Sequence, residues 1–143
     1  MPGPYIIPRM PTAGYSVKPL VAKLGIKPGH RIALVAAPAG FSLDGLPDAV
    51  RIVGPSAKDL DAVMFFVKSR AELARGFKRQ TARLGEGGVL WVAWPKKSSG
   101  VKTDVTEDVI REVVLPAGWV DVKVCAVDET WSGLKILRRR AKP

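Results

Sequence analysis

Three almost continuous apolar runs constrain the fold more than any other feature of this sequence. They are residues 31–37 (RIALVAA), 61–67 (DAVMFFV) and 88–94 (GVLWVAW). A strand with one face in water alternates apolar and polar residues, whereas a run that is apolar throughout suits a strand that is covered on both faces. Such strands are typical of parallel sheets with crossover connections on both sides. The three runs therefore predict the central strands of an α/β domain.

Helices are expected between and after these strands, because capping signals recur at the right spacing. Ser69 and Glu72 have the spacing of a capping box, in which each side chain accepts a hydrogen bond from a backbone N–H of the other residue. The helix that follows is predicted to end at Gly85. Asp104 and Glu107 repeat the same spacing and predict another helix that starts near Asp104.

The remaining strands complete the predicted sheet. Residues 50–53 favour a short second strand, and residues 119–127 alternate in polarity, with Val122 and Val124 on one face. Residues 133–139 favour a last strand, paired antiparallel through the loop that precedes it. This order predicts a three-layer α/β fold with a mostly parallel, Rossmann-like sheet and a C-terminal antiparallel hairpin.

The two ends of the chain differ from this middle part. Residues 1–14 contain four prolines, which favour an extended arm, and this arm is a possible contact between two copies in a homodimer. A short helix over residues 16–24, with Pro19 in its first turn, is expected next. We therefore divide the chain into the arm, one α/β domain over residues 15–139 and a basic tail over residues 140–143.

Composition excludes several classes of protein. The chain has 143 residues, and no apolar run approaches the roughly 18 residues of a membrane helix. It also lacks a convincing secretory signal, so a cytoplasmic location is expected. With one cysteine (Cys125) and one histidine (His30), neither an internal disulfide nor a zinc site built from protein ligands is expected. The net charge of +10 points to anionic partners.

A ligand site is expected where the loops after the strands gather. In open α/β sheets, ligands bind outside the carboxyl ends of the strands. Four loops of this chain should meet there, at residues 38–41, 68–70, 94–99 and 128–131. The candidate ligand-binding residues in these loops are Gly40, Lys68, Arg70, Trp94, Lys96, Lys97, Ser98, Ser99, Asp128, Glu129 and Trp131.

The chemistry of these candidates favours an anion. Lysine and arginine make the edge positive, and two helix N-termini, near Ser69 and Asp104, offer N–H groups and partial positive charge. The serine hydroxyls are further donors, and Trp94 and Trp131 are suited to stacking on a flat ligand. Asp128 and the neighbouring glutamate either pair with the lysines or act as acid or base. The alternative is that all these residues lie on ordinary solvated loops.

The usual signals of a nucleotide cofactor are missing. A dinucleotide or S-adenosylmethionine site needs glycines after the first strand, so that the backbone approaches the ligand. Residues 37–40 read Ala-Pro-Ala-Gly, with a single glycine. A carboxylate that binds the ribose is expected after the second strand, but residues 53–55 read Val-Gly-Pro. No standard cofactor is therefore expected.

Two resemblances add to this interpretation. The order of strands and the closing hairpin look like a shortened core of the class I S-adenosylmethionine-dependent methyltransferases. In addition, several motifs are similar to a family of small bacterial proteins known as domain of unknown function 3052. These motifs are residues 13–16 (AGYS), 23–29 (KLGIKPG), 94–100 (WPKKSSG), 103–107 (TDVTE) and 122–134 (VKVCAVDETWSGL). That family implies a bacterial cytoplasmic protein and brings no assigned activity or site residues.

Three functions remain open from the sequence. The first is a non-catalytic binding domain for an anionic, nucleotide-like small molecule at the carboxyl edge, with no cofactor. The second is a reduced methyltransferase that uses S-adenosylmethionine. The third is a nucleic-acid-binding protein that uses its basic surface, mainly Arg138, Arg139 and Arg140. A fourth possibility, a partner-binding role, depends on the N-terminal arm.

Overall fold

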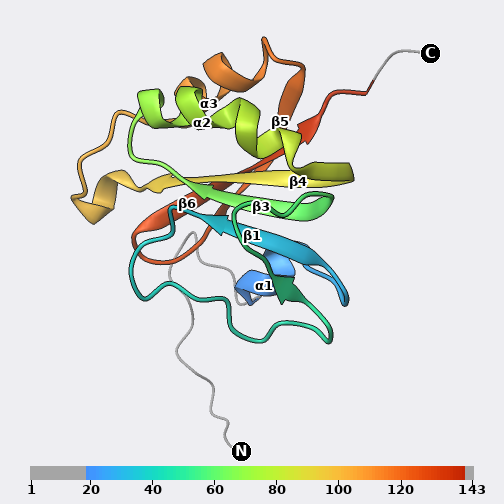
Figure 1. The fold of residues 1–143 in the computed structure, drawn as a ribbon. Coiled ribbons are helices and arrows are strands. Elements are labelled where there is room, and N and C mark those ends of the chain that lie inside the picture. Colours follow the sequence, from blue (N-terminus) through green and yellow to red (C-terminus); the bar gives the residue numbers. More distant parts are fainter. Residues whose placement is uncertain (1–18, 141–143) are drawn as a thin grey trace, which may run out of the picture.

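The computed structural model describes residues 19–140 and shows a six-stranded sheet with helices on both faces (Figure 1). The elements, in chain order, are α1 (Leu20–Lys23), β1 (Arg31–Val35), β2 (Arg51–Ile52), β3 (Leu60–Phe66), α2 (Arg70–Ala82), β4 (Leu84–Pro95), the 3₁₀ turn η1 (Lys97–Ser99), α3 (Glu107–Val114), β5 (Trp119–Ala126) and β6 (Trp131–Arg138). None of the described helices is long and apolar enough to cross a membrane.

The sheet has the strand order β2-β1-β3-β4-β6-β5. Neighbouring strands among the first four run parallel, whereas β6 runs antiparallel to both β4 and β5. The predicted fold class is confirmed, including the C-terminal antiparallel hairpin. The unbroken apolar runs form β1, β3 and most of β4, and β3 and the second half of β4 are buried on both faces.

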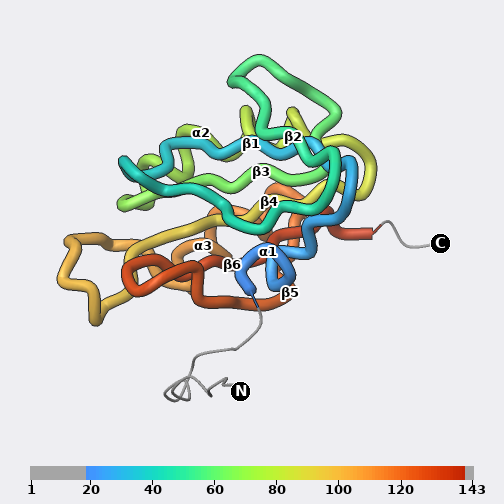
Figure 2. Tube along the Cα trace, turned by 90° about the horizontal axis from the view of Figure 1, so that it is seen from below, coloured from blue at the N-terminus to red at the C-terminus, as the bar shows by residue number. Residues whose placement is uncertain are grey.

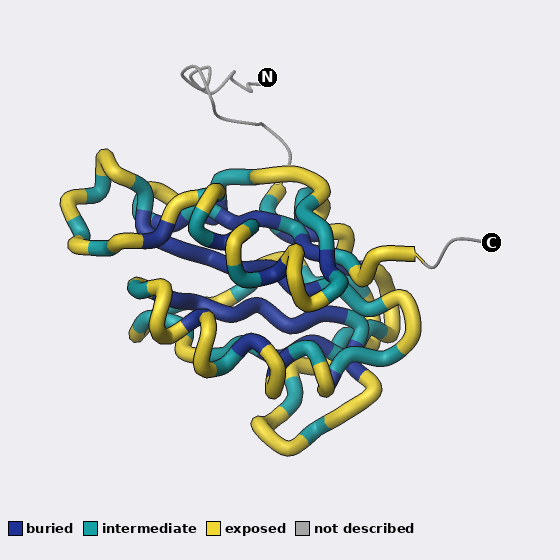
Figure 3. Tube along the Cα trace, turned by 90° about the horizontal axis from the view of Figure 1, so that it is seen from above, coloured by how far each residue is buried: buried dark blue, intermediate teal, exposed yellow. Residues whose placement is uncertain are grey.

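Two apolar clusters lie on opposite faces of the sheet. On one face, α2 and α3 pack against the central strands, with Phe65, Leu73 and Ile110 in the cluster. On the other face lie α1 and the long connection 36–50, which crosses beneath the central strands (Figure 2). Viewed from the α2 side, buried residues follow the strands and exposed residues follow the loops (Figure 3).

The edge near β2 is thinner than the predicted three layers. Residues 36–50 and 53–59 link β1 to β2 and β2 to β3, and neither connection contains a helix. As a result, Val35 is only half-buried, and a hollow of about 350 Å³ lies beside it on the α2 face. The prediction of burial on both faces therefore holds for β3 but is wrong for the carboxyl end of β1.

The capping box at α2 is confirmed in part. Ser69 is the N-cap, and its hydroxyl accepts a hydrogen bond from the Glu72 N–H at 3.0 Å. The Glu72 carboxylate accepts from the backbone N–H of Lys68 at 2.7 Å, one residue before the predicted donor. The prediction that Gly85 ends the helix was wrong, because the C-cap is Arg83 and the chain passes directly into β4.

Glycines at the start of β4 have a packing role instead. A Cβ on Gly88 would lie 2.8 Å from the carbonyl oxygen of Leu60 in β3, which is closer than real Cβ atoms approach. The register between the two strands shifts here, since Leu60 pairs with Leu84 while Ala62 pairs with Val89. The glycines thus allow an irregular stretch of β4 to lie against β3.

The predicted alternation in β5 fails at a second irregularity. Its register with β6 shifts between Asp121 and Lys123, which leaves Val122 without a regular pairing position. Val122 and Val124 are each 49% exposed, so neither contributes much to the core. A bulge and a lysine on an edge strand are known to discourage pairing with another chain.

The first helix is shorter than expected within the described residues. Pro19 occupies the N-cap position in an extended conformation, outside the first turn, and Gly25 follows the helix with a φ of +75°. The beginning of the predicted helix, the N-terminal arm and its proposed role in a homodimer, and most of the predicted tail fall outside the described residues. They stay predictions.

A buried arginine at the end of α2 binds the connection 53–59, which contains no helix. Arg83 is 5% exposed, and its guanidinium donates to the carbonyl oxygens of Ala57 (3.0 Å) and Gly54 (2.7 Å) and to the side chain of Gln80 (2.9 Å). Burial, and then repulsion from Arg79, lower the pKa of Arg83. Arg83 therefore supplies polar contacts on the side of the sheet where no crossover helix packs.

Replacing Arg83 by methionine should destabilise the protein by about 1–3 kcal/mol, because the partners of a charged donor lose their hydrogen bonds. Arg79→Met is the matched control, since Arg79 lies four residues away on the same helix and is exposed. The control should change the free energy of unfolding by less than about 0.5 kcal/mol. Urea denaturation measures both, and equal effects would contradict the role of Arg83.

Candidate functional site

The loops that the sequence placed at the carboxyl edge do lie together in the structure. The Lys96 N–H donates to the carbonyl oxygen of Thr130 at 2.8 Å, which joins the loop after β4 to the loop before β6. The hydroxyl of Thr103 donates to the Lys68 carbonyl oxygen at 2.7 Å. These bonds hold the loops after β3 and β4, and the β5–β6 connection, along one edge.

A crevice opens at this edge between β1 and β3. The connection after β1 leaves toward the α1 face, whereas the chain after β3 enters α2 on the opposite face, so the two diverge. This arrangement is the topological switch point at which α/β folds bind ligands. The space measures about 490 Å³ and is lined by Ala36, Pro38, Phe65, Phe66, Lys68, Glu72, Arg75, Gly76, Gln80 and Trp131. We call it the switch-point crevice.

Aromatic rings form the wall of the crevice toward the α1 face. The rings of Phe41 and Phe66 meet edge to face with centroids 4.9 Å apart, and those of Phe66 and Trp131 with centroids 5.1 Å apart. Trp131 is 6% exposed. Trp131 therefore belongs to the wall of the crevice, and its packed ring offers little surface for the stacking role expected from the sequence.

The turn after β1 has an unusual conformation. Ala36, the first residue after the strand, has a φ of +60°, in the left-handed region that glycine occupies most readily. Gly40 follows with a φ of +82° in a turn closed by a hydrogen bond from the Phe41 N–H to the Pro38 carbonyl oxygen. The left-handed turn after the first strand is thus present, although alanine stands in place of a glycine.

The charges of the crevice come from α2 and the residue before its cap. Lys68 and Arg75 are exposed cations among the lining residues, and Glu72 is the one carboxylate in that set. Gly76 brings the helix close to the sheet, because a Cβ there would lie 2.6 Å from the Phe65 ring. Lys68 and Trp131 were predicted site residues. Ala36, Glu72 and Arg75 were not, although Arg75 stands six residues after Ser69 on the predicted helix.

Trp94 and Lys97 line a second hollow at the same edge and not the crevice. The second hollow measures about 490 Å³ and lies between the end of β4 and the start of α3, with Trp94, Lys97, Asp104 and Arg111 among its lining residues. Trp94 is 8% exposed and is part of the apolar cluster beneath α2 and α3. Of the predicted site residues, Lys68 and Trp131 therefore line the crevice, Trp94 and Lys97 line the second hollow, and the others line neither.

The helix N-termini are less available to a ligand than expected. Asp104 is not the cap of α3; that cap is Thr106, whose hydroxyl accepts from the Val109 N–H at 3.1 Å. Asp104 instead accepts a hydrogen bond from the Arg70 N–H at 2.7 Å, at the first residue of α2. A carboxylate of the protein thus takes a position in which the sequence suggested a bound anion.

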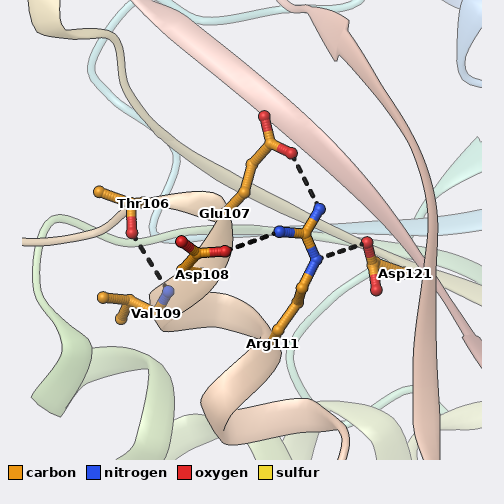
Figure 4. Close-up of polar contacts among 6 residues, drawn as sticks. All are labelled: Thr106, Glu107, Asp108, Val109, Arg111 and Asp121. Atoms are coloured by element: carbon orange, nitrogen blue, oxygen red, sulfur yellow. Dashed lines mark hydrogen bonds and ion pairs between the residues drawn. The ribbon is translucent and has the colours of Figure 1, made fainter.

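A cluster of carboxylates surrounds Arg111 at the start of α3 (Figure 4). Its guanidinium donates to Asp121 and Asp108, each at 2.9 Å, and to Glu107 at 3.1 Å. The hydrogen bond with Asp121 is the main cause that raises the pKa of Arg111. These contacts tie α3 to β5, which accounts for the cluster as a structural feature.

The remaining predicted residues have mainly local roles in the described structure. The Ser99 hydroxyl donates to the Lys96 carbonyl oxygen at 2.6 Å and accepts from the Val101 N–H, which closes the turn η1. Asp128 accepts from the N–H groups of Thr130 and Trp131, both at 2.8 Å, and makes no ion pair with a described lysine. Gly40, Arg70, Ser98 and Glu129 are exposed and line neither hollow, and Arg70, the first residue of α2, forms an ion pair with Glu112 at 3.5 Å.

The single histidine and cysteine lie away from this edge or have limited access. His30 stands before β1, at the opposite end of that strand, and its Nδ1 accepts from the Lys27 N–H at 3.2 Å. Burial raises the pKa of the Cys125 thiol, so the reactive thiolate is disfavoured. Within residues 19–140 no three His, Cys, Asp or Glu side chains form a group that could hold a metal ion.

Solved structures, among them SAM-dependent methyltransferases, share this fold. A SAM-dependent methyltransferase from Aquifex aeolicus has a TM-score of 0.61 at 12% identity, over 82% of this chain and 86% of that one. The DhpI–SAH complex has a TM-score of 0.58 at 14% identity, over 85% and 83%. A TehB-like SAM-dependent methyltransferase from Corynebacterium glutamicum has a TM-score of 0.56 at 13% identity, over 89% and 91%. At these identities the likeness is one of fold alone, and it agrees with the methyltransferase-like architecture expected from the strand order.

Sequence comparisons add no assignment. No protein-family model matches the chain, and no relative in sequence is found among curated proteins. The resemblance to domain of unknown function 3052 therefore stays a prediction.

The structural neighbours include SAM-dependent methyltransferases, and the crevice of this chain matches the size of S-adenosylmethionine but only some of its groups. Its position, its aromatic wall and its volume of about 490 Å³ suit a nucleoside-sized ligand. The chain turns at Ala36 in a left-handed conformation, beside the crevice. The carboxylate that would bind the ribose is missing after β2, where Val53 and Gly54 stand. The one carboxylate among the lining residues is Glu72 of α2. The residues therefore fit the ligand's size and its apolar parts better than its polar groups.

Replacing Ala36 by glycine should stabilise the protein by about 0.5–1 kcal/mol, because glycine adopts the left-handed conformation without a Cβ penalty. Ala37→Gly is the control, since Ala37 is half-buried with an ordinary φ, and it should destabilise by about 0.5–1 kcal/mol. The midpoints of urea denaturation, compared at an unchanged m-value, measure the change in the free energy of unfolding. Destabilisation by both substitutions would contradict the left-handed turn.

Proposed function

We propose that the chain is a reduced S-adenosylmethionine-dependent methyltransferase that uses the switch-point crevice to hold its cofactor. The observation that carries the proposal is the crevice itself, which lies at the carboxyl edge between β1 and β3, beside a left-handed turn at Ala36. The likeness of the fold to several methyltransferases supports it. Fold does not determine function, so the proposal depends on the site and its test.

The residues of the crevice have distinct roles under this proposal. Phe66 and Trp131 exclude water from the apolar wall. Lys68 lies at the mouth and holds a carboxylate, either that of the amino-acid part of the cofactor or that of an acidic substrate. Glu72 keeps the loop before α2 in place through its hydrogen bond with the Lys68 N–H. When bound, the cofactor would supply a methyl group activated by a positive sulfonium.

A second candidate, favoured by the charge of the crevice, is a non-catalytic domain that binds an anionic, nucleotide-like small molecule. Lys68 and Arg75 outnumber Glu72 among the lining residues, and the chain as a whole carries +10. A phosphate would gain from both cations, whereas the sulfonium of S-adenosylmethionine would be repelled. The two candidates therefore differ in the charge of the ligand that binds.

Calorimetry with ligands of different charge separates the candidates. S-adenosylmethionine carries a net positive charge, S-adenosylhomocysteine is neutral overall, and AMP is an anion. The proposed methyltransferase should bind the first two with submillimolar Kd, and AMP more weakly. Tight binding of AMP alone would instead establish the anion-binding candidate, and no heat with any of the three at millimolar concentration would exclude both.

Lys68→Ala should raise the Kd of the ligand about tenfold, because one charge-assisted hydrogen bond contributes about 1.4 kcal/mol to binding. Lys102→Ala is the matched control, because Lys102 is an exposed lysine in the loop after β4 and does not line the crevice. The control should leave the Kd within about twofold if specific contacts, not the overall charge, bind the ligand. Equal losses would place binding outside the crevice.

A further inference from the structure

The opposite, amino edge of the sheet contains a larger hollow that the proposed function does not use. It measures about 980 Å³ and lies where β4 and β5 begin and β6 ends. Its lining includes Gly87, Trp119 and three consecutive arginines, Arg138, Arg139 and Arg140. We call this hollow the arginine groove. It shares no lining residue with the switch-point crevice.

The structure holds two of the three arginines in defined positions. The Arg138 guanidinium carbon lies 4.9 Å from the centre of the Trp119 ring, a cation–π contact. The Arg139 backbone N–H donates to the Gly118 carbonyl oxygen at 2.8 Å, and its side chain donates to the Leu115 carbonyl oxygen at 3.3 Å, after the end of α3. The backbone pairing of β5 with β6 therefore extends one residue beyond both strands, to Arg139 and Gly118.

The positive charge of the groove is not neutralised by the described part of the protein. All three arginines are exposed, and none forms an ion pair with a carboxylate among residues 19–140. Glu86 is the one carboxylate in the lining. By contrast, Arg111 at the other edge is surrounded by three carboxylates. Among the described residues, carboxylates therefore neutralise Arg111, whereas Arg138, Arg139 and Arg140 have no carboxylate partner.

Part of the groove lining is glycine backbone, because Gly85, Gly87 and Gly88 belong to it beside Leu84 and Glu86. Residues 85–88 read Gly-Glu-Gly-Gly and form the irregular start of β4. A Cβ on Gly87 would meet no atom within 4 Å, so its surface side is open. Glycine backbone in the lining lets a bulky ligand approach closely, and the arginines of the same lining match the charge and bidentate geometry of phosphate groups.

We propose that the arginine groove binds the phosphodiester backbone of a nucleic acid without reading its sequence. Three consecutive arginines in one groove suit the successive phosphates of a chain better than a single small anion, and Glu86 is the one carboxylate in the lining. Trp119 is 5% exposed and already covered by Arg138, so it does not stack on bases. Binding is therefore mainly electrostatic, and its strength depends on salt.

The test measures the affinity of the full chain for a short labelled single-stranded RNA of mixed sequence and for duplex DNA, by fluorescence anisotropy at several salt concentrations. We expect a Kd of about 10⁻⁴–10⁻⁶ M near physiological salt. The double variant Arg139→Ala/Arg140→Ala should lose about tenfold or more at low salt. The slope of log K against log salt should become shallower by about 1–2, since each phosphate contact contributes about 0.7–0.9.

Two variants keep the test specific. Lys96→Ala/Lys97→Ala removes the same charge at the opposite edge of the sheet and should leave most of the affinity. Arg139→Lys/Arg140→Lys retains the charge and should restore most of the binding, which separates charge from any loss of the Leu115 contact. Equal losses in the two alanine double variants, or equal affinity for polyglutamate, would overturn the proposal. The relative affinity for RNA and duplex DNA identifies the natural form of the ligand.

Discussion

Burial of β3 and β4 on both faces is the constraint on which the rest of the structure depends. Phe65, Leu90 and Val92 pack toward α2 and α3, while Met64 and Trp91 pack toward α1. A strand covered on both faces requires connections that leave the sheet in opposite directions. The divergence of the chain after β1 and after β3 follows from that requirement, and so does the crevice between them. The crevice is in this sense a consequence of how the core is built.

The thin edge near β2 shows how the fold tolerates the loss of two crossover helices. An apolar strand face without a helix above it would be left in contact with water. Here the loop 53–59 lies over part of β1, and Arg83 binds two of its carbonyl oxygens from α2. The buried guanidinium lies in a polar environment made mostly of backbone. This arrangement leaves the carboxyl end of β1 partly open and widens access to the crevice around Ala36.

The fold was largely predictable from the sequence, while the composition of the site was less so. Apolar runs and their order are local signals, and they identified the strands and the mixed sheet correctly. Asp104 accepts a hydrogen bond from the first residue of α2, which is distant from it in sequence. Its spacing from Glu107 is a local signal only, and it therefore indicated the wrong N-cap for α3. Ala36 carries no signal at all, because alanine seldom adopts a positive φ. Arg75 was visible as a cation, but only the packing of α2 brought it to the crevice.

The charge of the chain therefore acts differently at the two edges of the sheet. At the carboxyl edge, the carboxylates Asp104, Glu107 and Asp108 stand among the cations, and protein groups take many of the available hydrogen-bond donors. At the amino edge, Arg138–Arg140 share the lining of the groove with three glycines and one glutamate. A small ligand that also gains from apolar contact suits the first environment. An extended polyanion that gains mainly from unneutralised charge suits the second. Since the two hollows share no residue, a single domain of this size has room for both ligands at once.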